Sequence, residues 1–207
     1  MFHEIEKYFP NLAGEQLNNL LKLSEIYNRW NAMINVISRK DMDNFYTHHV
    51  LHSLAIAKLV DFVPGTTILD VGAGGGFPGI PLAILFPEVE FTLIDSIDKK
   101  IKVITAVKNE LKLNNVTPLK KRVEDEKNRY HFVTGRAVMK FPEFVKITRK
   151  NIHTNSINKI ANGIIYLKGG DLADELAQFA GKVNVYDINA FFDNQFFETK
   201  KIVYLPV

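Results

Sequence analysis

The sequence predicts an α/β fold in which helices cover both faces of a doubly wound, mostly parallel β-sheet, preceded by an N-terminal helical extension. Strand-like apolar runs alternate with helical patterns from about residue 66 onward, which is typical of such sheets. The first 65 residues show helical periodicity and no strand pattern. One strand, residues 67–71, is followed at once by five glycines within residues 72–79. We therefore expect a helical extension over residues 1–65 and a sheet domain over residues 66–207.

The expected elements follow one another in a regular order. In the extension, apolar residues recur at helical spacing over residues 14–36 and 41–60, and Pro64 and Gly65 then interrupt the pattern. In the sheet domain, short β-branched and aromatic runs alternate with amphipathic segments. We expect strands at residues 67–71, 90–95, 116–123, 131–137, 163–170, 183–188 and 201–205, and helices at residues 80–86, 98–113, 141–152 and 171–180.

The glycines after the first strand indicate a nucleotide-like ligand. Glycine permits positive φ and lets a ligand approach the backbone closely, and the following helix presents its N-terminus to that ligand. Gly74, Gly76 and Gly79 match the dinucleotide fingerprint G-x-G-x-x-G. If the count starts at Gly72, the glycine nearest the strand, Phe77 occupies the third glycine position. A nicotinamide dinucleotide is therefore one candidate ligand among others.

Polar residues stand at the ends of the second and fourth expected strands. Asp95 lies 23 residues beyond the first loop glycine, near the roughly 20-residue spacing at which a second-strand acid accepts hydrogen bonds from ribose hydroxyls. It can equally complement the dipole of the next helix. Arg136 ends the strand expected beside the first one, which indicates an anionic ligand or a nucleic acid. An ion pair with Asp70 or Glu124 is the alternative.

Charge and composition narrow the functional classes. The net charge is +3, but residues 97–150 hold 15 Lys and Arg against 6 Asp and Glu. Such a basic segment favours a surface for polyanions, and solvated faces of amphipathic helices are the alternative. The chain has no cysteine, which excludes disulfides, thiolate zinc sites and iron–sulfur clusters. No apolar run approaches the roughly 20 residues of a membrane span, and the first residues lack signal-peptide features, so we expect a cytoplasmic protein.

Several motifs together carry a specific resemblance. The order Asp-x-Gly-x-Gly at residues 70–74 resembles motif I of the class I S-adenosylmethionine (SAM) methyltransferases. Over nearly its whole length, the chain is similar to the bacterial 16S rRNA guanine-N7 methyltransferases, formerly called glucose-inhibited division protein B. The matching segments are residues 30–31, 35–38, 49–53, 70–82, 93–96, 99–100, 122–124, 135–137 and 167–170.

The resemblance implies a class I SAM methyltransferase fold and methyl transfer from SAM (S-adenosyl-L-methionine) to N7 of a specific guanine in the decoding-region loop of 16S rRNA. Together with the residue patterns above, it implies cofactor contacts at Gly72, Gly74, Phe77, Asp95, Val123, Glu124 and Arg136. It also implies substrate contacts at Arg122, Arg136 and Lys168. The implied partner is 16S rRNA or the small ribosomal subunit, and we expect a monomer that binds neither a metal nor a membrane.

The sequence departs from the family pattern in the second N-terminal helix. The family has arginine–histidine and aspartate–serine where this chain has His48-His49 and His52-Ser53. His48 and His52 share a helix face, but the sequence lacks the glutamate of H-E-x-x-H and an evident third ligand. We therefore expect these histidines to be packed in the interior or to contact RNA phosphates rather than to bind a metal.

The expected chemistry depends on positioning. N7 of guanine has a free lone pair and loses no proton on methylation, so no catalytic acid or base is expected. The methylated ring gains a positive charge, which Asp70 is a candidate to stabilise. Gly135-Arg136-Ala137 stands where exocyclic-amine methyltransferases carry an Asn/Asp-Pro-Pro-aromatic loop, and the lack of cysteine removes the nucleophile of C5-pyrimidine methylation. Since N7 faces the narrow major groove of A-form RNA, the guanine must lie in a loop or leave its stack.

Two other functions stay open. An NAD-dependent small-molecule oxidoreductase would use the glycine motif as a dinucleotide fingerprint. A non-catalytic SAM-binding RNA module would share the fold and the cofactor but transfer no methyl group. Binding of SAM in preference to NAD distinguishes the first alternative, and methyl transfer distinguishes the second.

Overall fold

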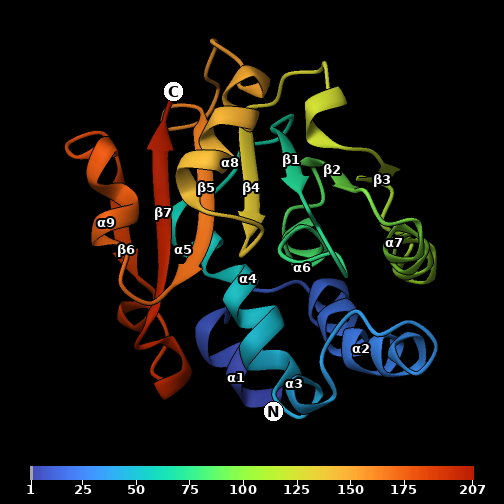
Figure 1. Cartoon of the computed structure of the whole chain (residues 1–207). Helices are drawn as coiled ribbons and strands as arrows, with labels where there is room; N and C mark the ends of the chain where they lie inside the picture. Colours follow the sequence, from blue (N-terminus) through green and yellow to red (C-terminus); the bar gives the residue numbers. More distant parts are fainter. Residues whose placement is uncertain (1) are drawn as a thin grey trace.

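The computed structural model contains a seven-stranded sheet with the strand order β3-β2-β1-β4-β5-β7-β6 (Figure 1). It describes residues 2–207, apart from the side chains of residues 2, 3 and 39. The chain runs outward from β1 to β3, returns to β4 beside β1 and continues to β5, and these five strands are parallel. β7 lies antiparallel between β5 and β6. The strands are β1 Thr67–Val71, β2 Glu90–Asp95, β3 Val116–Lys120, β4 Phe132–Arg136, β5 Gly163–Gly169, β6 Asn184–Asp187 and β7 Lys200–Pro206.

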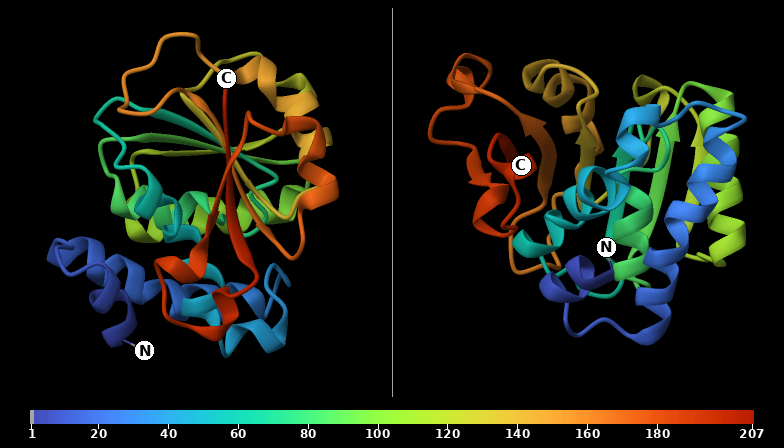
Figure 2. Two further views of the ribbon diagram at one scale, coloured as in Figure 1. Left: turned by 90° about the vertical axis from the view of Figure 1, so that its left-hand side faces the viewer. Right: turned by 90° about the horizontal axis from the view of Figure 1, so that it is seen from below.

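Helices cover both faces of this sheet, which confirms the predicted doubly wound α/β fold (Figure 2). Successive strand residues point to opposite faces. Ile68 and Phe132 therefore belong to the buried cluster that includes α6 and α7, whereas Leu69 and Val133 belong to the cluster that includes α8 and α9. The helices of the sheet domain are α6 Gly79–Leu85, α7 Asp98–Leu111, α8 Phe141–Thr148 and α9 Ala173–Leu176.

The N-terminal helices lie below the carboxyl ends of the parallel strands (Figure 1). They are α1 Phe2–Tyr8, α2 Gly14–Asn31, α3 Arg39–Met42, α4 His52–Leu54 and α5 Ile56–Leu59, with a π-helical turn, Tyr46–Leu51, before α4. The helical structure predicted over residues 41–60 is therefore present, but it is divided into several short segments. The helical pattern is correct, but the backbone changes its winding within it, and such π-helical turns are frequent at functional sites.

The helix predicted over residues 14–36 ends early, at Asn31, because the Asn31 amide organises the loop that follows. Its Oδ1 accepts hydrogen bonds from the backbone N–H groups of Val36 at 2.8 Å and Ile37 at 3.0 Å. Its Nδ2 donates to the carbonyl of Ile37 at 2.7 Å. The loop after α2 therefore has a fixed shape.

Three predicted elements differ at their ends. The third strand ends at Lys120, where its pairing with β2 ends, and a 3₁₀ turn, Val123–Asp125, follows it. The helix predicted over residues 141–152 becomes a 3₁₀ turn after Thr148. The helix predicted over residues 171–180 is one α-helical turn followed by a 3₁₀ turn.

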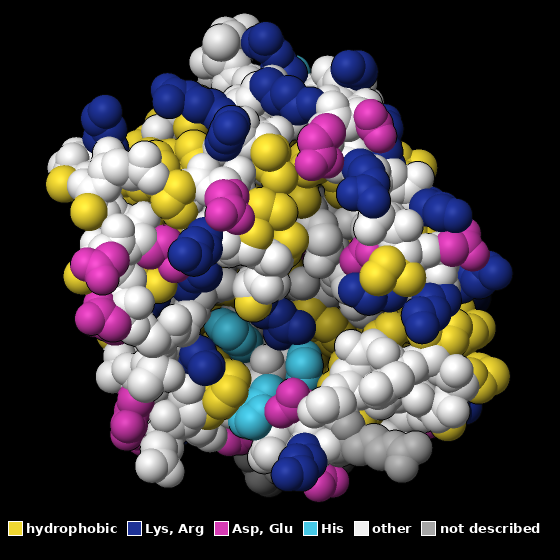
Figure 3. Space-filling view, viewed as in Figure 1, with side chains coloured by type: hydrophobic (Ala, Val, Ile, Leu, Met, Phe, Trp, Pro, Cys, Tyr) yellow, Lys and Arg dark blue, Asp and Glu magenta, His cyan; other side chains and the backbone are white. Residues whose placement is uncertain are grey.

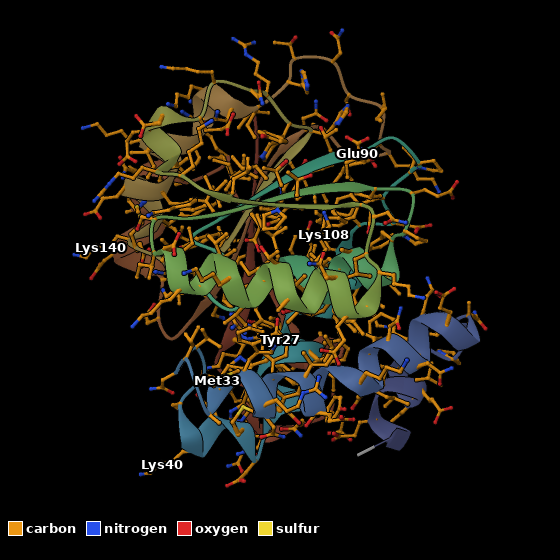
Figure 4. All side chains as sticks on the ribbon, turned by 90° about the vertical axis from the view of Figure 1, so that its right-hand side faces the viewer. Tyr27, Met33, Lys40, Glu90, Lys108 and Lys140 are labelled. Atoms are coloured by element: carbon orange, nitrogen blue, oxygen red, sulfur yellow. The ribbon has the colours of Figure 1, made fainter. Side chains whose placement is uncertain are left out.

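The extension and the sheet domain share one hydrophobic cluster. The ring of Tyr27 in α2 lies 5.4 Å from that of Phe45 and 4.9 Å from that of Phe77, between ring centroids. The Tyr27 hydroxyl donates to the carbonyl of Gly75 in the glycine loop. Figure 4 shows Tyr27 on the side of α2 that faces the sheet domain. The division of the chain at residue 65 stays a prediction. None of the described helices has the length and apolar character needed to cross a membrane.

Candidate active site

A cavity of about 490 Å³, here called the glycine-loop cavity, opens at the carboxyl ends of the parallel strands. Open α/β sheets bind ligands at this edge, where the strand order reverses between β1 and β4. The loops after β1, β2, β3 and β4 form its walls, and Val36 closes one side from the N-terminal extension. The lining includes eight residues predicted from the sequence: Gly72, Gly74, Phe77, Asp95, Arg122, Val123, Glu124 and Arg136.

The loop after β1 requires glycine at specific positions. Gly72 has a φ of +64°, and a Cβ there would lie 2.9 Å from the side chain of Val138, so a larger residue is excluded on both grounds. Gly79 begins α6, and a Cβ there would lie 2.8 Å from Oδ2 of Asp70 and from Leu93. The Gly79 N–H donates to the same Oδ2 at 2.9 Å. The motif therefore forms a tight turn that places its backbone along the cavity.

Asp70 supports this turn from below. Its carboxylate is fully buried and accepts hydrogen bonds from Gly79 and from Oγ1 of Thr134, the latter at 3.3 Å. Burial raises the pKa of Asp70 to about 7, although these hydrogen bonds and the charge of Arg136 oppose the shift. Asp70 does not line the glycine-loop cavity. The carboxylate lies beneath the loop, and the suggestion that it stabilises a cation on the methylated base stays a prediction.

Asp95 is held by backbone groups on both sides of the cavity edge, and its predicted contact with ribose hydroxyls stays a prediction. Oδ2 accepts from the Gly74 N–H at 3.0 Å, and Oδ1 accepts from the Ile97 N–H at 2.9 Å at the start of α7. Lys100 lies 3.5 Å from Oδ2. A carboxylate has about four acceptor positions, so two backbone amides leave capacity for ligand hydroxyls. The side chain lines the cavity in a fixed orientation.

The segment after β3 contributes one apolar side chain and two exposed charged ones. Val123 is buried within its 3₁₀ turn, whereas Arg122 and Glu124 are exposed, and all three line the glycine-loop cavity. The Lys150 ammonium donates to the Glu124 carbonyl at 2.6 Å and connects this turn to the 3₁₀ turn that follows α8. Arg122 thus lies with the predicted cofactor residues rather than apart from them.

Arg136 extends from the end of β4 and is held by the π-helical turn. Its Nη1 donates to the carbonyl of His48 at 3.2 Å, and its Nη2 lies 3.1 Å from Nδ1 of His49. Its guanidinium carbon lies 5.2 Å from the centroid of the Phe77 ring. Among the described side chains, no carboxylate comes within 4.0 Å of the guanidinium, so the alternative of an ion pair with Asp70 or Glu124 is not realised.

Burial and charge determine the protonation states of Arg136 and His49. Burial, together with the positive charge of Arg136, lowers the pKa of His49 to about 3. Burial lowers the pKa of Arg136 to about 10, still well above neutral pH. At neutral pH the imidazole is therefore uncharged and accepts a hydrogen bond from the charged guanidinium. The arrangement provides an oriented cation without a carboxylate counter-charge.

A second cavity of about 350 Å³, here called the cationic pocket, adjoins the first. It is lined by His52, Arg136, Ala137, Met139, Lys140, Leu167, Lys168, Gly169 and Lys200. Arg136, Ala137 and Met139 line both cavities, which therefore meet at the end of β4. Ala137 has a φ of +53°, a left-handed conformation that is uncommon for alanine and concentrates at functional sites. Figure 3 shows histidine, lysine and arginine side chains gathered around a hollow on this side of the molecule.

The predicted residue Lys168 lines only the cationic pocket, and its ammonium lies 2.8 Å from Oε1 of Glu175. His49 and His52 are packed in the interior, as one of the two expectations had it, whereas His48 is partly exposed. The His48 ring stacks on Phe196 with centroids 3.8 Å apart, and its Nδ1 lies 3.0 Å from Asp41. Within the part of the chain that the structure describes, no group of three or more potential ligands could hold a metal.

Several lining residues of these cavities were not assigned to the site from the sequence, among them Val36, His52, Lys140 and Lys200. Val36 reaches the glycine-loop cavity because Asn31 shapes its loop, and the Trp30-Asn31 motif was the available signal. His52, Lys140 and Lys200 line the cationic pocket but come from three distant parts of the chain. No local pattern connects those three residues.

Comparison with known proteins identifies a family whose members resemble this chain over most of its length. The model of the GidB family, described as rRNA small subunit methyltransferase G, matches residues 16–202. A protein of Flavobacterium johnsoniae named ribosomal RNA small subunit methyltransferase G is 54% identical, over 99% of this chain and 97% of its own. A protein of the same name from Phocaeicola vulgatus is 52% identical, over 98% and 97%.

Solved structures show likeness of fold alone. A SAM-dependent methyltransferase from Aquifex aeolicus matches with a TM-score of 0.56 and 18% identity, over 82% of this chain and 98% of that one. The fibrillarin/Nop5p complex matches with a TM-score of 0.53 and 11% identity, over 73% and 78%. The arrangement of strands and helices is thus that of the class I methyltransferases.

Proposed function

Since the chain belongs to the rRNA small subunit methyltransferase G family, a family of SAM-dependent methyltransferases, we propose that it methylates N7 of a specific guanine in the decoding-region loop of 16S rRNA. The single observation that best supports this function is the junction of two cavities at Arg136, Ala137 and Met139. One cavity suits a nucleoside cofactor, and the other suits an anionic acceptor. A base and a cofactor bound in them would meet at this junction.

The glycine-loop cavity fits SAM. We propose that Asp95, with acceptor capacity left beside its two backbone partners, binds the ribose hydroxyls. The apolar side chains of Val123, Ile94 and Ile147 line the same cavity and suit an adenine ring. Gly72, Gly74, Phe77, Glu124 and Arg136 complete the proposed cofactor contacts. SAM supplies an electrophilic methyl group on a sulfonium.

The residues of the junction suit a reaction without a general base. At neutral pH His49 is already engaged as an acceptor for Arg136, and its pKa of about 3 makes it a poor base. N7 needs no base, because it attacks through a free lone pair. The contribution of this chain is then to hold the guanine in line with the methyl group and to exclude water. Arg136 is oriented for that task before the RNA binds.

The acceptor is proposed to be RNA on the basis of charge. Arg136 and Lys168 line the cationic pocket, and the wider segment over residues 97–150 is strongly basic. Contacts with phosphates release counterions, so affinity for the RNA should fall as salt increases. We further propose that the protein acts as a cytoplasmic monomer on 16S rRNA or the small ribosomal subunit.

The experiment that tests this function is transfer of labelled methyl from SAM to unmodified 16S rRNA and to small-subunit particles, followed by borohydride–aniline cleavage at N7-methylguanine. We expect a single cleavage site in the decoding region. Label without cleavage would contradict N7 as the acceptor atom. Binding of SAM without any transfer would instead favour a non-catalytic RNA-binding module. Calorimetry with SAM and NAD checks the cofactor, and we expect binding of SAM alone.

A further inference from the structure

The loop after β4, residues 137–139, forms a wall that the two cavities share. Ala137 and Met139 line both cavities, and Val138 lines the glycine-loop cavity. Val138 also packs closely on the glycine loop, since a Cβ on Gly72 would lie 2.9 Å from its side chain. The position of this loop therefore determines how a ligand in one cavity lies relative to a ligand in the other.

A single buried hydroxyl holds this loop. Tyr166 of β5 is fully buried, and its hydroxyl accepts hydrogen bonds from the backbone N–H groups of Val138 at 2.8 Å and Met139 at 3.0 Å. The same hydroxyl donates to the Met139 carbonyl at 3.0 Å. A phenolic hydroxyl can both donate and accept, and here it does both toward the backbone of the loop. Three backbone groups of the loop thus share one partner on the neighbouring strand.

A glycine on β4 makes room for this contact. Gly135 and Tyr166 are partners in the pairing of β4 with β5, which lie side by side (Figure 1). A Cβ on Gly135 would lie 2.8 Å from the Tyr166 ring and 2.8 Å from Phe144 of α8. The Tyr166 ring also packs on Phe144, with ring centroids 4.4 Å apart. The ring therefore lies against its glycine partner and α8, and its hydroxyl reaches the loop beyond the end of β4.

The loop needs this support because Ala137 has an unfavourable backbone conformation. Its φ of +53° is left-handed, and in that region the Cβ of an L-residue crowds the following carbonyl oxygen. The Ala137 N–H still donates to the Leu167 carbonyl of β5 at 3.3 Å, and the chain bends there. The next two N–H groups are the ones that Tyr166 accepts. Strained conformations of this kind persist only where surrounding contacts hold them.

We propose that Tyr166 is a positioning residue for methyl transfer, because its hydroxyl holds residues 137–139 in the conformation that aligns the acceptor base with the cofactor. This proposal rests on the proposed function. Tyr166 lines neither cavity, so it acts through the loop rather than by contact with either ligand. Alignment matters most in a reaction without a general base, because the rate then depends on how the attacking nitrogen and the methyl group are placed.

The variant that tests this role is Tyr166→Phe, which removes the hydroxyl and keeps the packed ring. Tyr204→Phe is the matched control, because the buried Tyr204 also uses its hydroxyl on the backbone, at 2.6 Å from the Ala161 carbonyl, and lines neither cavity. In labelled-methyl transfer to 16S rRNA or small-subunit particles, we expect Tyr166→Phe to lower kcat by about tenfold to 100-fold. The KM for the RNA and the affinity for S-adenosylhomocysteine should change by less than about threefold, because neither ligand touches Tyr166. Tyr204→Phe should keep the kcat of the wild type.

Hydrogen exchange of the two loop amides gives a readout that does not depend on turnover. In the wild type, we expect the N–H groups of Val138 and Met139 to exchange slowly in ¹⁵N NMR, although they lie outside the helices and strands. In Tyr166→Phe both should exchange about tenfold faster, and in Tyr204→Phe neither should change. Fast exchange of these amides in the wild type would overturn the proposal without reference to any variant.

Comparison of the two variants separates alignment from stability. Equal kcat in Tyr166→Phe and Tyr204→Phe would overturn the positioning role. A higher KM for the RNA with unchanged kcat would also overturn it, because the hydroxyl would then support binding rather than alignment. Either result leaves the proposed function standing as long as the wild type methylates N7. Absence of methyl transfer by the wild type would instead overturn the proposed function and, with it, the role of Tyr166 in alignment.

Discussion

Arg136 is oriented by its neighbours before any substrate arrives. The carbonyl of His48 and the neutral ring of His49 accept from two of its nitrogens. A charged histidine could not accept, so the depressed pKa of His49 is what allows the contact. A side chain already held in place loses little conformational freedom on binding. The sequence indicated that Arg136 contacts a ligand. It could not reveal that a histidine 87 residues away orients the guanidinium, because that contact is tertiary.

Replacing Arg136 should reduce methyl transfer without unfolding the protein. Loss of one pre-oriented donor at a reacting centre typically reduces turnover about 100-fold or more. We expect Arg136→Ala to show that loss in the labelled-methyl assay with an unchanged unfolding transition. Arg29→Ala is the control, because that guanidinium pairs with Glu25 and Glu110 on the surface. Equal turnover in the two variants would rule out the role assigned to Arg136.

Asp70 makes folding stability depend on pH. Its pKa is about 7 in the folded state and ordinary when unfolded, so between about pH 4 and 7 the folded state holds a proton that the unfolded state has lost. Stability contributed by this group is therefore present at low pH and decreases as pH rises toward 7.

We expect urea unfolding to show this decrease. From pH 5 to 7 the wild-type free energy of unfolding should fall by on the order of 2 kcal/mol relative to Asp70→Asn, which keeps an acceptor for Gly79 but does not titrate. Asp61→Asn, at an exposed position, should follow the wild type. Parallel pH profiles for the wild type and Asp70→Asn would show that the Asp70 carboxyl does not titrate in this range.

At the scale of elements, the unit β1–loop–α6 could be predicted because its pattern is local. The signals for the buried strand, the glycine loop and the helix all lie within 19 residues, 67–85, so each supports the prediction of the next. The π-helical turn could not be predicted in this way, because its sequence has ordinary helical periodicity. Packing of His49 against Phe45 and Phe77 accompanies the altered winding, and those contacts are tertiary.

We expect stability and cofactor binding to be sensitive to a substitution at Gly79. Gly79→Ala would place a methyl group 2.8 Å from both Asp70 and Leu93 in a closely packed interior. We expect a loss of about 1–3 kcal/mol in the free energy of unfolding and weaker binding of S-adenosylhomocysteine. Gly14→Ala, at the start of α2 with no atom within 4 Å of the added carbon, should change neither by much. Similar effects of both substitutions would contradict the packing described for α6.

Asn31 does not line the glycine-loop cavity, but we expect its replacement to weaken binding of the cofactor through the loop after α2. Asn31→Ala removes three hydrogen bonds that hold Val36 and Ile37, and Val36 closes one side of the glycine-loop cavity. We expect affinity for S-adenosylhomocysteine to fall by about tenfold, equivalent to about 1.4 kcal/mol, in calorimetry. Asn28→Ala, one helical turn earlier at an exposed position, is the control. Unaltered affinity in Asn31→Ala would show that the loop does not shape the cavity.

At the scale of the molecule, the N-terminal helices and the sheet domain depend on each other. Ile80 and Ile84 of α6 are buried in the cluster that contains Leu20 and Leu23 of α2. Contacts also join the two ends of the chain, since the Tyr8 hydroxyl accepts from the Asp193 N–H at 2.9 Å. The α/β class could be predicted from alternating patterns, but these long-range contacts could not, because they join segments that share no local signal.

Residues 66–207 should therefore fail to fold alone. Removal of residues 1–65 exposes the apolar surface of α6, and an exposed face of that kind destabilises a domain and promotes association. We expect no cooperative thermal transition and no binding of S-adenosylhomocysteine by this fragment, in contrast to the full chain. A cooperative transition with retained binding would instead support the predicted division at residue 65 as a boundary between independent domains.

The position of β7 between β5 and β6 affects the order in which the two cavities can form during synthesis. All lining residues of the glycine-loop cavity precede residue 148, so the last 60 residues of the chain contribute none of that lining. The cationic pocket is incomplete until Lys200 arrives on β7, which must enter between β5 and β6. During synthesis from the N-terminus, every lining residue of the glycine-loop cavity leaves the translating ribosome before the cationic pocket can close. If the proposed function holds, a nascent chain should be unable to methylate RNA until its final strand is in place.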